Sequence, residues 1–479
     1  MELNTETLAR VAIRKPDYDR SKIRPGIVHL GIGAFHRAHQ AVYIDELLAR
    51  QPEWGIIGAS LRSAATAEAL TPQDCLYTLI EQAEVGPEYR VVGSVMDVLV
   101  AGFEREALLQ VMSRPDIRIV SLTVTEKGYC HDPATGRLNR DHPDIRADIV
   151  TPLNPVSAPG FIVEALRRRR GAGCGPFTVL SCDNLPSNGQ LCRRVVVELA
   201  TLTDPGLAAW IEDNATFPGT MVDRIVPATT DEDRALLLTE TGLNDSWPVV
   251  TEPYSQWVIE DNFCAGRPAF EDVGVQMVAD VEPFETMKLR LLNGSHSALA
   301  YLGSMAGHET VAQAMQDPDL ASFVRDLMRE EIAPTLDMPE GVDLDAYQAA
   351  LLERFRNPGL RHKLLQIASD GSQKLPQRLL NPIRERLNDG LPAKRLATCV
   401  AAWMTFVSIR DERGYRFKLN DPLAEPIRQL VADCGGDPNS LIKALLAFEM
   451  VFGTDLARSE TFSGQLLLEF ERHCWIKPA

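Results

Sequence analysis

Four polar side chains interrupt an apolar helical segment in the second half of the chain. The segment KLRLLNGSHSAL, residues 288–299, carries Lys288, Asn293 and His296, and Glu285 precedes it by three positions. On a regular α-helix, which turns by about 100° per residue, these four side chains fall within one arc. Any one of them alone is more often a hydrogen-bonded residue at a packing interface. All four on one side of a helix indicate a reactive site.

Oxidation of a secondary alcohol needs groups of these types. Hydride leaves carbon for a nicotinamide while the hydroxyl proton goes to a base. Lys288 can be that base if burial and the positive end of its own helix lower its pKa toward neutrality. Asn293 then donates a hydrogen bond to the alkoxide or carbonyl oxygen, and His296 holds a neighbouring hydroxyl. Glu285 either passes the proton to solvent or forms an ion pair with Lys288.

A glycine-rich turn in the first half favours dinucleotide binding. The stretch GIVHLGIGAFHRAHQ, residues 26–40, places glycines between an apolar strand and a helix. Gly31 permits a tight turn and Gly33 lets backbone N–H groups approach a pyrophosphate, although such turns also occur as packing devices. His36 stands where the third glycine of the usual fingerprint would be. Further candidates for the cofactor site in this turn are Phe35, His36 and Arg37.

The ends of the next two strands set the expected cofactor. The second strand ends in GASLRSA, with Arg62 in place of the acid that commonly holds the ribose hydroxyls. Arg62 either accepts a 2′-phosphate, stacks on adenine or is solvated, so NAD is expected and NADP is not excluded. The third strand runs into TVTEKGY at the edge of the sheet where cofactors lie. Candidates for the nicotinamide side, or alternatively for an exposed charged turn, are Thr125, Glu126 and Lys127.

Two further polar residues follow strands of the first half. Asn184 comes after FTVLSCD, where its amide is either a second donor to the substrate oxygen or part of an Asx-turn. Asp223, in TMVDRIVP, either accepts hydrogen bonds from substrate hydroxyls or forms a buried structural pair with Arg224. His36 and His39 are the nearest approach to a metal-binding pattern and lack a third ligand at suitable spacing. We therefore expect chemistry without a metal.

The elements that must position these residues fall into two halves. The first half alternates β-rich runs with amphipathic stretches, which is typical of an α/β fold whose parallel sheet is wound with helices. After about residue 283 the apolar spacing is helical, and Asp280 and Pro283 are suited to begin the helix that carries Lys288. We expect a dinucleotide-binding domain at 1–282 and a mostly α-helical substrate and catalytic domain at 283–479. The predicted strands are residues 26–31, 54–60, 117–124 and 177–182.

Composition excludes several classes of partner. The 479 residues are 45% hydrophobic and carry a net charge of -17, which indicates a globular protein and argues against nucleic acid or an anionic membrane surface. The sequence lacks a leader pattern and a run of 18 uncharged apolar residues, so a cytoplasmic location is expected. Its nine cysteines are scattered without a CxxC pair and are expected to be reduced thiols.

The motifs together resemble a known family. GIGAFHRAH, TVTEKGY, SCDN, VDRIVP and KLRLLNGSHS, in this order and across nearly the whole chain, resemble the polyol-specific long-chain dehydrogenases, the mannitol dehydrogenase family. SLRSA, PQDCLY and DGSQKLPQR look most like its D-mannonate oxidoreductase (fructuronate reductase) branch. The resemblance implies a Rossmann-type N-terminal domain, a helical C-terminal domain with a cleft between the two, and metal-free, NAD(P)-dependent interconversion of a ketose carbonyl and a secondary alcohol.

The resemblance also implies a role for each candidate residue. The residue matching Lys288 is the acid/base catalyst, and those matching Asn184 and Asn293 form the oxyanion hole. The residues matching His296 and Asp223 contact substrate, and the one matching Glu285 gates proton exit. The acid that follows the second strand in the mannitol enzymes is not evident here, which leaves NAD against NADP open.

Charge sets the expected substrate. Mannonate and fructuronate carry a carboxylate, so the site needs a cation besides Lys288, and the candidates are Arg361, Lys374 and Arg378, each of which is alternatively a surface charge. We expect an oxidoreductase that interconverts D-fructuronate and D-mannonate, acting as a monomer or small homo-oligomer on a small-molecule sugar acid. The alternatives are a mannitol or other alditol dehydrogenase and, in another class, a dinucleotide-binding sensor without turnover.

Overall fold

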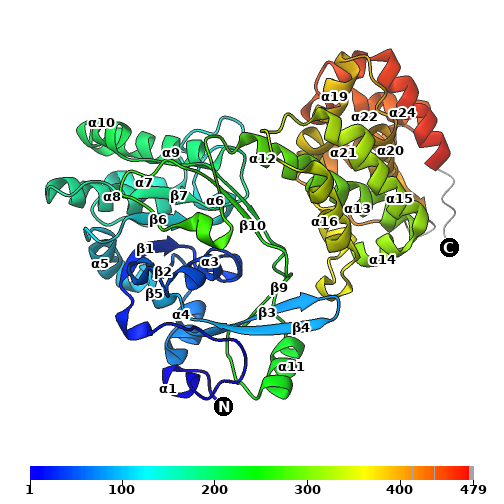
Figure 1. The fold of residues 1–479 in the computed structure, drawn as a ribbon. Helices are drawn as coiled ribbons and strands as arrows, with labels where there is room; N and C mark the ends of the chain where they lie inside the picture. The colour runs from blue at the N-terminus through cyan, green and yellow to red at the C-terminus, as the bar shows by residue number, and fades with distance from the viewer. Residues whose placement is uncertain (412–413, 436, 474–479) are drawn as a thin grey trace. The chain divides into compact units, whose positions relative to one another are not determined.

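The computed structural model describes residues 1–411, 414–435 and 437–473 (Figure 1). Its contacts divide the chain into two compact units, Met1–Glu282 and Pro283–Ala479. The first is an α/β unit and the second is mostly helical, so the predicted fold class is confirmed. Among the described residues no helix is long and apolar enough to span a bilayer. Eight of the nine cysteines are free thiols, and Cys474 lies outside the described residues.

A five-stranded parallel sheet forms the centre of the first unit. Its strand order is β5-β2-β1-β6-β7, and every neighbouring pair is parallel. The chain moves outward on one side of β1 and then crosses to β6 on the other, which makes the carboxyl ends of β1 and β6 the switch point where ligands bind in open α/β sheets. The strands are β1 (Pro25–Leu30), β2 (Gly55–Ser60), β5 (Val95–Val100), β6 (Ile119–Leu122) and β7 (Thr178–Ser181).

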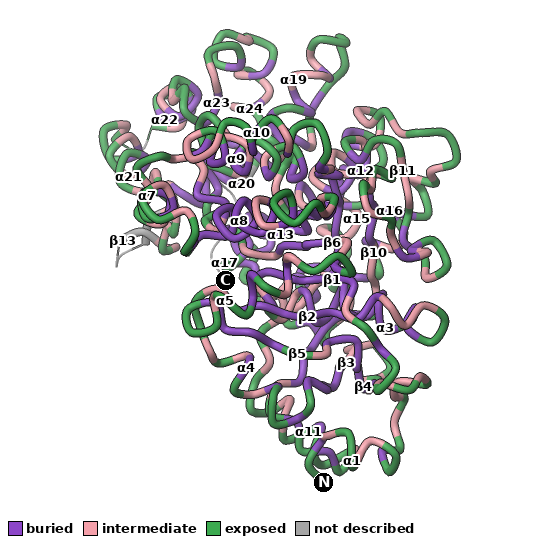
Figure 2. Tube along the Cα trace, turned by 90° about the vertical axis from the view of Figure 1, so that its left-hand side faces the viewer, coloured by how far each residue is buried: buried purple, intermediate pink, exposed green. Residues whose placement is uncertain are grey.

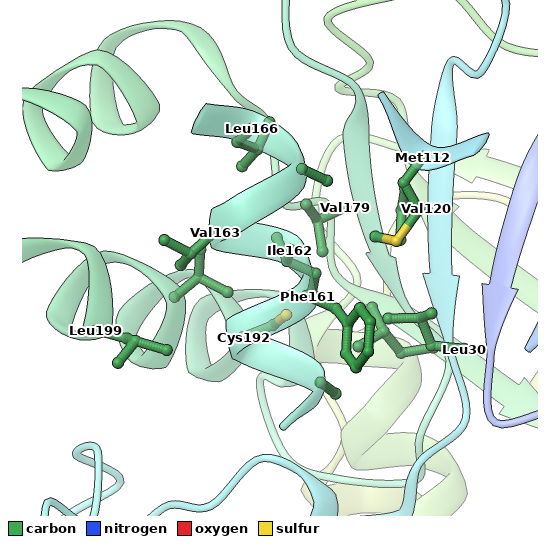
Figure 3. Close-up of a cluster of buried hydrophobic side chains, with 14 of the residues drawn as sticks. Leu30, Met112, Val120, Phe161, Ile162, Val163, Leu166, Val179, Cys192 and Leu199 are labelled. Atoms are coloured by element: carbon green, nitrogen blue, oxygen red, sulfur yellow. The ribbon is translucent and has the colours of Figure 1, made fainter. Parts of the chain in front are cut away.

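Helices pack on both faces of this sheet because strand side chains alternate in direction. Val28 and Leu30 join the core under the helices of one face, whereas Ile27 joins the core of the other. Figure 3 shows Phe161 and Ile162 of one helix directed toward the strands. Figure 2 shows the strands as the buried centre of this unit. The first face carries α5 (Ala101–Met112), α8 (Ala158–Gly171), α9 (Asn188–Thr203) and α10 (Pro205–Asn214), and the second carries α3 (Gln40–Leu47) and α4 (Ala65–Leu70).

Two small sheets complete the first unit. The hairpin of β3 (Tyr77–Ala83) and β4 (Gly86–Val92) pairs with β9 (Val249–Thr251). The other sheet has the order β11-β10-β8, and β8 ends at Asp223. Its strands are β8 (Thr220–Asp223), β10 (Gln256–Glu260) and β11 (Gln276–Val278); the helix α11 (Asp231–Thr241) follows β8.

The second unit is built around two buried helices. All side chains of α20 (Lys394–Ser408) from Leu396 to Val407 are buried, as are those of α13 (Gly294–Ala306) from Gly294 to Met305, because both helices are apolar on nearly every side. Around them lie α14 (Val311–Gln316), α15 (Pro318–Asp326), α16 (Leu344–Arg356), α17 (Leu364–Ile367), α18 (Gly371–Leu375), α19 (Asn381–Asn388), α21 (Ala424–Asp433), α22 (Pro438–Leu446), α23 (Glu449–Phe452) and α24 (Glu460–His473).

The helix at the unit boundary begins where the sequence predicts. Asp280 accepts a hydrogen bond from the backbone N–H of Glu282 at 2.9 Å, and α12 (Glu282–Met287) starts there with Pro283 as its second residue. The expected continuous α-helix is wrong beyond this point. Residues Lys288–Asn293 form a π-helical turn, and α-helical geometry resumes only at Gly294.

Candidate active site

The glycine turn after β1 is fixed by its neighbours at the switch point. Gly31 has φ of +92°, and a Cβ there would lie 2.3 Å from the carbonyl oxygen of Thr123, which follows β6. The Thr123 hydroxyl donates to the Gly31 carbonyl at 2.9 Å and receives a hydrogen bond from Nε2 of His29 at 2.8 Å. Burial lowers the pKa of His29 to about 3, so its ring is neutral at pH 7. The turn therefore needs glycine and is held rigidly.

Gly33 leaves open the space that a dinucleotide would require. It is exposed, and a Cβ at this position would meet nothing nearer than the Gly31 carbonyl oxygen at 3.8 Å. The helix that follows, α2 (Ala34–Ala38), is short and ends at His39, where φ and ψ of −124° and −89° separate it from α3. The open backbone at Gly33 fits a pyrophosphate, whose oxygens need close approach to N–H groups.

The ring of His36 explains why the third glycine is absent. That glycine normally allows a helix to approach a strand closely. Here the His36 ring stacks on His29 of β1 with centroids 3.5 Å apart, so an aromatic contact replaces the close approach. Burial, and after it the proximity of His29 and the charge of Arg37, lower the pKa of His36, which is neutral at pH 7.

The two neighbours of His36 face different surroundings. Phe35 is half-buried and stacks on His39 at 5.2 Å. Arg37 is buried, donates from Nη1 to the Trp247 carbonyl at 2.5 Å and lies over the Tyr77 ring at 5.2 Å. These contacts tie Arg37 to the interior of the unit, and its part in cofactor binding stays a prediction.

A cavity of about 210 Å³ lies at the carboxyl ends of the strands. Gly31, Arg62 and Thr125 line it, which brings together residues from the ends of β1, β2 and β6. Asp144 and Cys130 also contribute to its wall. Glu126 and Lys127, on α6 (Thr125–Gly128), are exposed.

The turn at Thr125 depends on a residue that the sequence patterns did not reveal. Asp183 accepts hydrogen bonds from the backbone N–H groups of Val124 and Thr125 at 2.9 and 2.8 Å and from the Tyr129 hydroxyl at 2.8 Å. Thr125 itself has φ of +64°. The two hydrogen bonds that Asp183 accepts from Val124 and Thr125 stabilise this left-handed backbone. The only sequence signal is the position of Asp183 at the end of a predicted strand.

Asn184 follows Asp183 and is exposed. Nearby, the buried side chain of Asn188 donates to the Asp183 carbonyl at 2.9 Å and to the Thr220 carbonyl at 2.8 Å, so it joins the end of β7 to the start of β8. Asp223 lies buried at the other end of β8. Arg224, next in the chain, forms an ion pair with Glu81, which accounts for its charge in the interior.

One group of possible metal ligands occurs in the described part of the chain. Ligand atoms of Cys130, His142 and Asp144 lie within 4.8 Å of one another. Two of these residues already make other contacts. Asp144 forms an ion pair with Arg62 at 3.1 Å. Nδ1 of His142 accepts a hydrogen bond from the backbone N–H of Asp144 at 3.2 Å and so caps α7 (Pro143–Val150). Burial, with the charges of Asp144 and Asp148, raises the pKa of the Cys130 thiol to about 12, so it is protonated.

In the second unit the π-helical turn changes how the polar residues align. In a π-helix the hydrogen bonds run from residue i to i+5, so Lys288 and Asn293 lie one turn apart on the same side. Glu285 precedes Lys288 by three residues in α12, and His296 follows Asn293 by three in α13. Lys288 is 8% exposed and His296 is 6% exposed, while Glu285 and Asn293 are half-buried. Single π-turns are often found at functional sites.

Arg290, on the other side of the π-helical turn, anchors the turn to neighbouring elements. Nη1 and Nη2 of Arg290 form two hydrogen bonds with the Glu385 carboxylate at 2.5 and 2.6 Å, and Nη1 also donates to the Thr335 carbonyl at 2.8 Å. Leu291 and Leu292 are buried. Of the polar residues in the turn, Arg290 therefore has a structural role, and Lys288 and Asn293 are the candidates for chemistry.

Cationic side chains gather beside Asn293 and His296. Arg378 donates from Nη1 to the Asn293 carbonyl at 3.3 Å and to the Ser297 hydroxyl at 3.2 Å. Burial lowers the pKa of Arg378 to about 10, which still leaves it charged at pH 7. Burial, followed by the charges of His362, Arg378 and Arg354, lowers the pKa of His296. His296 is therefore neutral and lies next to concentrated positive charge.

The two other predicted cations differ in their surroundings. Lys374 donates from Nζ to the Ile367 and Ser369 carbonyls at 3.2 and 2.6 Å, and burial together with the charge of Arg378 lowers its pKa. Arg361 is exposed and has left-handed backbone with φ of 44°. The structure thus brings Lys374 close to Arg378, and it places Arg361 at the surface.

These features define the class of protein. A parallel sheet of this order, with a glycine turn at its switch point, is the architecture of Rossmann-type dinucleotide-dependent oxidoreductases. The chain belongs to the mannitol dehydrogenase family: residues 25–272 match the mannitol dehydrogenase Rossmann domain and residues 280–474 match the mannitol dehydrogenase C-terminal domain. It is an oxidoreductase that acts on CH–OH groups, and the predicted family is confirmed.

Relatives cover the whole chain. D-mannonate oxidoreductase of Escherichia coli is 46% identical over 97% of this chain and 96% of its own length. The mannitol 2-dehydrogenase of Pseudomonas fluorescens, solved as a ternary complex with NAD and D-mannitol, is 40% identical, covers 100% of both chains and has a TM-score of 0.84. A substrate-free D-sorbitol dehydrogenase is 36% identical, covers 100% of this chain and 99% of its own, and has a TM-score of 0.93.

Two glycine substitutions should separate folding from cofactor binding. Gly31→Ala forces a side chain into left-handed backbone and against the Thr123 carbonyl, so we expect the free energy of unfolding to fall by about 2 kcal/mol or more. Gly33→Ala, with open space around it, should leave the melting temperature unchanged and weaken NADH binding. Thermal unfolding and NADH titration of both variants test this, and equal destabilisation by the two would contradict it.

Proposed function

We propose that the protein is an NAD-dependent oxidoreductase that interconverts D-fructuronate and D-mannonate with Lys288 as the acid/base. The observation that carries the substrate class is the position of Arg378, which donates to the Asn293 carbonyl and the Ser297 hydroxyl and has Lys374 near it. A guanidinium beside the candidate residues is suited to bind an anion, and the carboxylate is what distinguishes a sugar acid from a polyol. NAD is supported by the glycine turn and by the NAD complex of the Pseudomonas relative.

The proposed roles follow from the chemistry of the reduction. Bound NADH supplies the hydride to the keto carbon. Lys288 donates a proton to the oxygen that becomes the alcohol, and Asn293 and Asn184 donate hydrogen bonds that stabilise negative charge on it. His296 and Asp223 hold neighbouring hydroxyls, and Glu285 passes the proton between Lys288 and solvent. In the direction of oxidation each proton transfer reverses.

Arg378 is the residue best suited to the substrate carboxylate. Both of its hydrogen bonds in the described part of the chain use Nη1, so Nη2 and Nε can face a carboxylate as a fork. Lys374 reinforces the charge, since its own hydrogen bonds go to neutral carbonyl groups. Arg361, at the surface, is proposed to draw the anionic substrate in against a net charge of -17.

The mannitol and sorbitol relatives favour a second candidate within the same class, a dehydrogenase of neutral alditols. Initial rates with D-fructuronate, D-tagaturonate and D-fructose, each with NADH and with NADPH, decide between the two. We expect kcat/KM for fructuronate to exceed that for fructose by about 100-fold, because a hydrogen bond to a charged group is worth about 1.5 to 3 kcal/mol. A preference for fructose would reject the carboxylate assignment.

A further inference from the structure

The ribose end of the cofactor cavity holds an acid that comes from an unexpected element. Arg62 follows β2 by two positions, where an acid normally accepts hydrogen bonds from the ribose hydroxyls. Its Nη2 pairs at 3.1 Å with Oδ2 of Asp144, which lies 82 residues later in the first turn of α7. Both residues line the cavity together with Gly31. We infer that Asp144 replaces the missing acid and makes the protein select NAD against NADP.

The chemistry of the ribose explains the selection. A free arginine at this position would bind the 2′-phosphate of NADP through a two-pronged, charge-assisted contact. Asp144 neutralises that arginine and also places a carboxylate where the phosphate, with a charge of about −1.5 to −2, would lie. Like charges brought together in this way disfavour the wrong ligand. The 2′-hydroxyl of NAD is instead a hydrogen-bond donor that a carboxylate accepts.

The carboxylate of Asp144 has the capacity for both tasks. Its described ion pair uses Oδ2, and Oδ1 is the atom assigned to the ribose. The next acid of α7, Asp148, is buried, and its two oxygens accept hydrogen bonds from the N–H groups of Val156 and Ser157 and from the Ser157 hydroxyl. Asp144 is thus the carboxylate of this helix that serves the cavity.

The ion pair between Arg62 and Asp144 is too exposed for folding stability to be its main role. The Arg62 side chain is 77% exposed and that of Asp144 is 32% exposed, and ion pairs this exposed contribute little to folding. A structural role for Asp144 does remain, since an acid in the first turn favours the helix, and that role predicts an effect on melting temperature only. Selectivity between the two cofactors is the property that separates the two roles.

Binding of NADH and NADPH, followed by nucleotide fluorescence, tests the inference. It rests on the proposed dinucleotide site and not on the sugar substrate, so a binding measurement remains valid if the substrate assignment fails. We expect the unmodified protein to prefer NADH. Asp144→Asn should tighten NADPH binding by about tenfold, because it frees Arg62 for the phosphate, and should weaken NADH binding slightly. The double variant Arg62→Ala with Asp144→Asn should lose that gain.

The matched control is Asp141→Asn, which removes an exposed acid just before α7 that pairs with Arg146 at 2.6 Å. It should leave the NADH to NADPH ratio unchanged. Melting temperatures of all variants report any structural effect separately. The inference is overturned if Asp144→Asn leaves the ratio as it was, if the double variant keeps the gain, or if the unmodified protein prefers NADPH.

Discussion

The Lys288→Ala variant should lose about 10²- to 10⁴-fold in kcat for fructuronate while it still binds NADH, because a positioned acid/base group contributes rate accelerations of this size. Lys288 is the buried amine of the π-helical turn and shares its side with Asn293. The glycine turn belongs to the unit Met1–Glu282 and Lys288 to the unit Pro283–Ala479. Stopped-flow measurement of NADH oxidation and a separate NADH titration give the two quantities.

The control for this experiment is Lys394→Ala, which removes an exposed lysine at the start of α20 and should change neither quantity. Added ethylamine should restore part of the rate of Lys288→Ala, because a free amine can enter the space of the missing side chain and carry the proton. Undiminished kcat in Lys288→Ala would remove the lysine from the mechanism. A chain that binds NADH but turns over no sugar even with Lys288 intact would instead be the non-catalytic sensor.

The sheet and the helical second half were predictable because local composition determines them. The strands β1, β2, β6 and β7 are short apolar runs followed by turn residues, and each was found within two residues of its predicted limits. The strand β5 was missed because Asp97 interrupts its apolar run, and only pairing with β2 shows that this residue can lie in the sheet. The break between α2 and α3 at His39 was not predicted, because it has no local signal and the His39 ring contacts the distant Gln256 carbonyl.

Long-range partners set the parts of the site that the sequence could not give. The π-turn at Lys288 has no local signal, because its stability depends on partners such as Glu385, which lies 95 residues from Arg290. In the same way Asp183 holds a turn 58 residues earlier, and Asp144 meets Arg62 across 82 residues. The residue types alone identified Lys288, Asn293 and His296 as candidates. Their spacing on an ideal α-helix gave the wrong angles between the side chains, because Lys288–Asn293 form a π-helical turn.

Arg378→Ala should reduce kcat/KM for fructuronate by about 100-fold and leave that for fructose nearly unchanged, since a charge-assisted hydrogen bond to a carboxylate is worth about 1.5 to 3 kcal/mol and a neutral ketose offers none. Arg378→Lys should recover part of the loss, because the charge returns without the two-pronged geometry. Steady-state rates with both sugars at saturating NADH measure the ratio.

The ratio is informative because Arg378 also has a structural role. Its guanidinium supports the Asn293 carbonyl and the Ser297 hydroxyl, so a displaced Asn293 would slow both sugars alike. A selective loss for the sugar acid therefore identifies the carboxylate contact, and an equal loss for both sugars identifies support of the oxyanion site. Arg325→Ala, which removes an exposed arginine of α15 paired with Asp326, is the control and should alter neither rate. An unchanged rate for fructuronate in Arg378→Ala would assign substrate charge recognition to another cation.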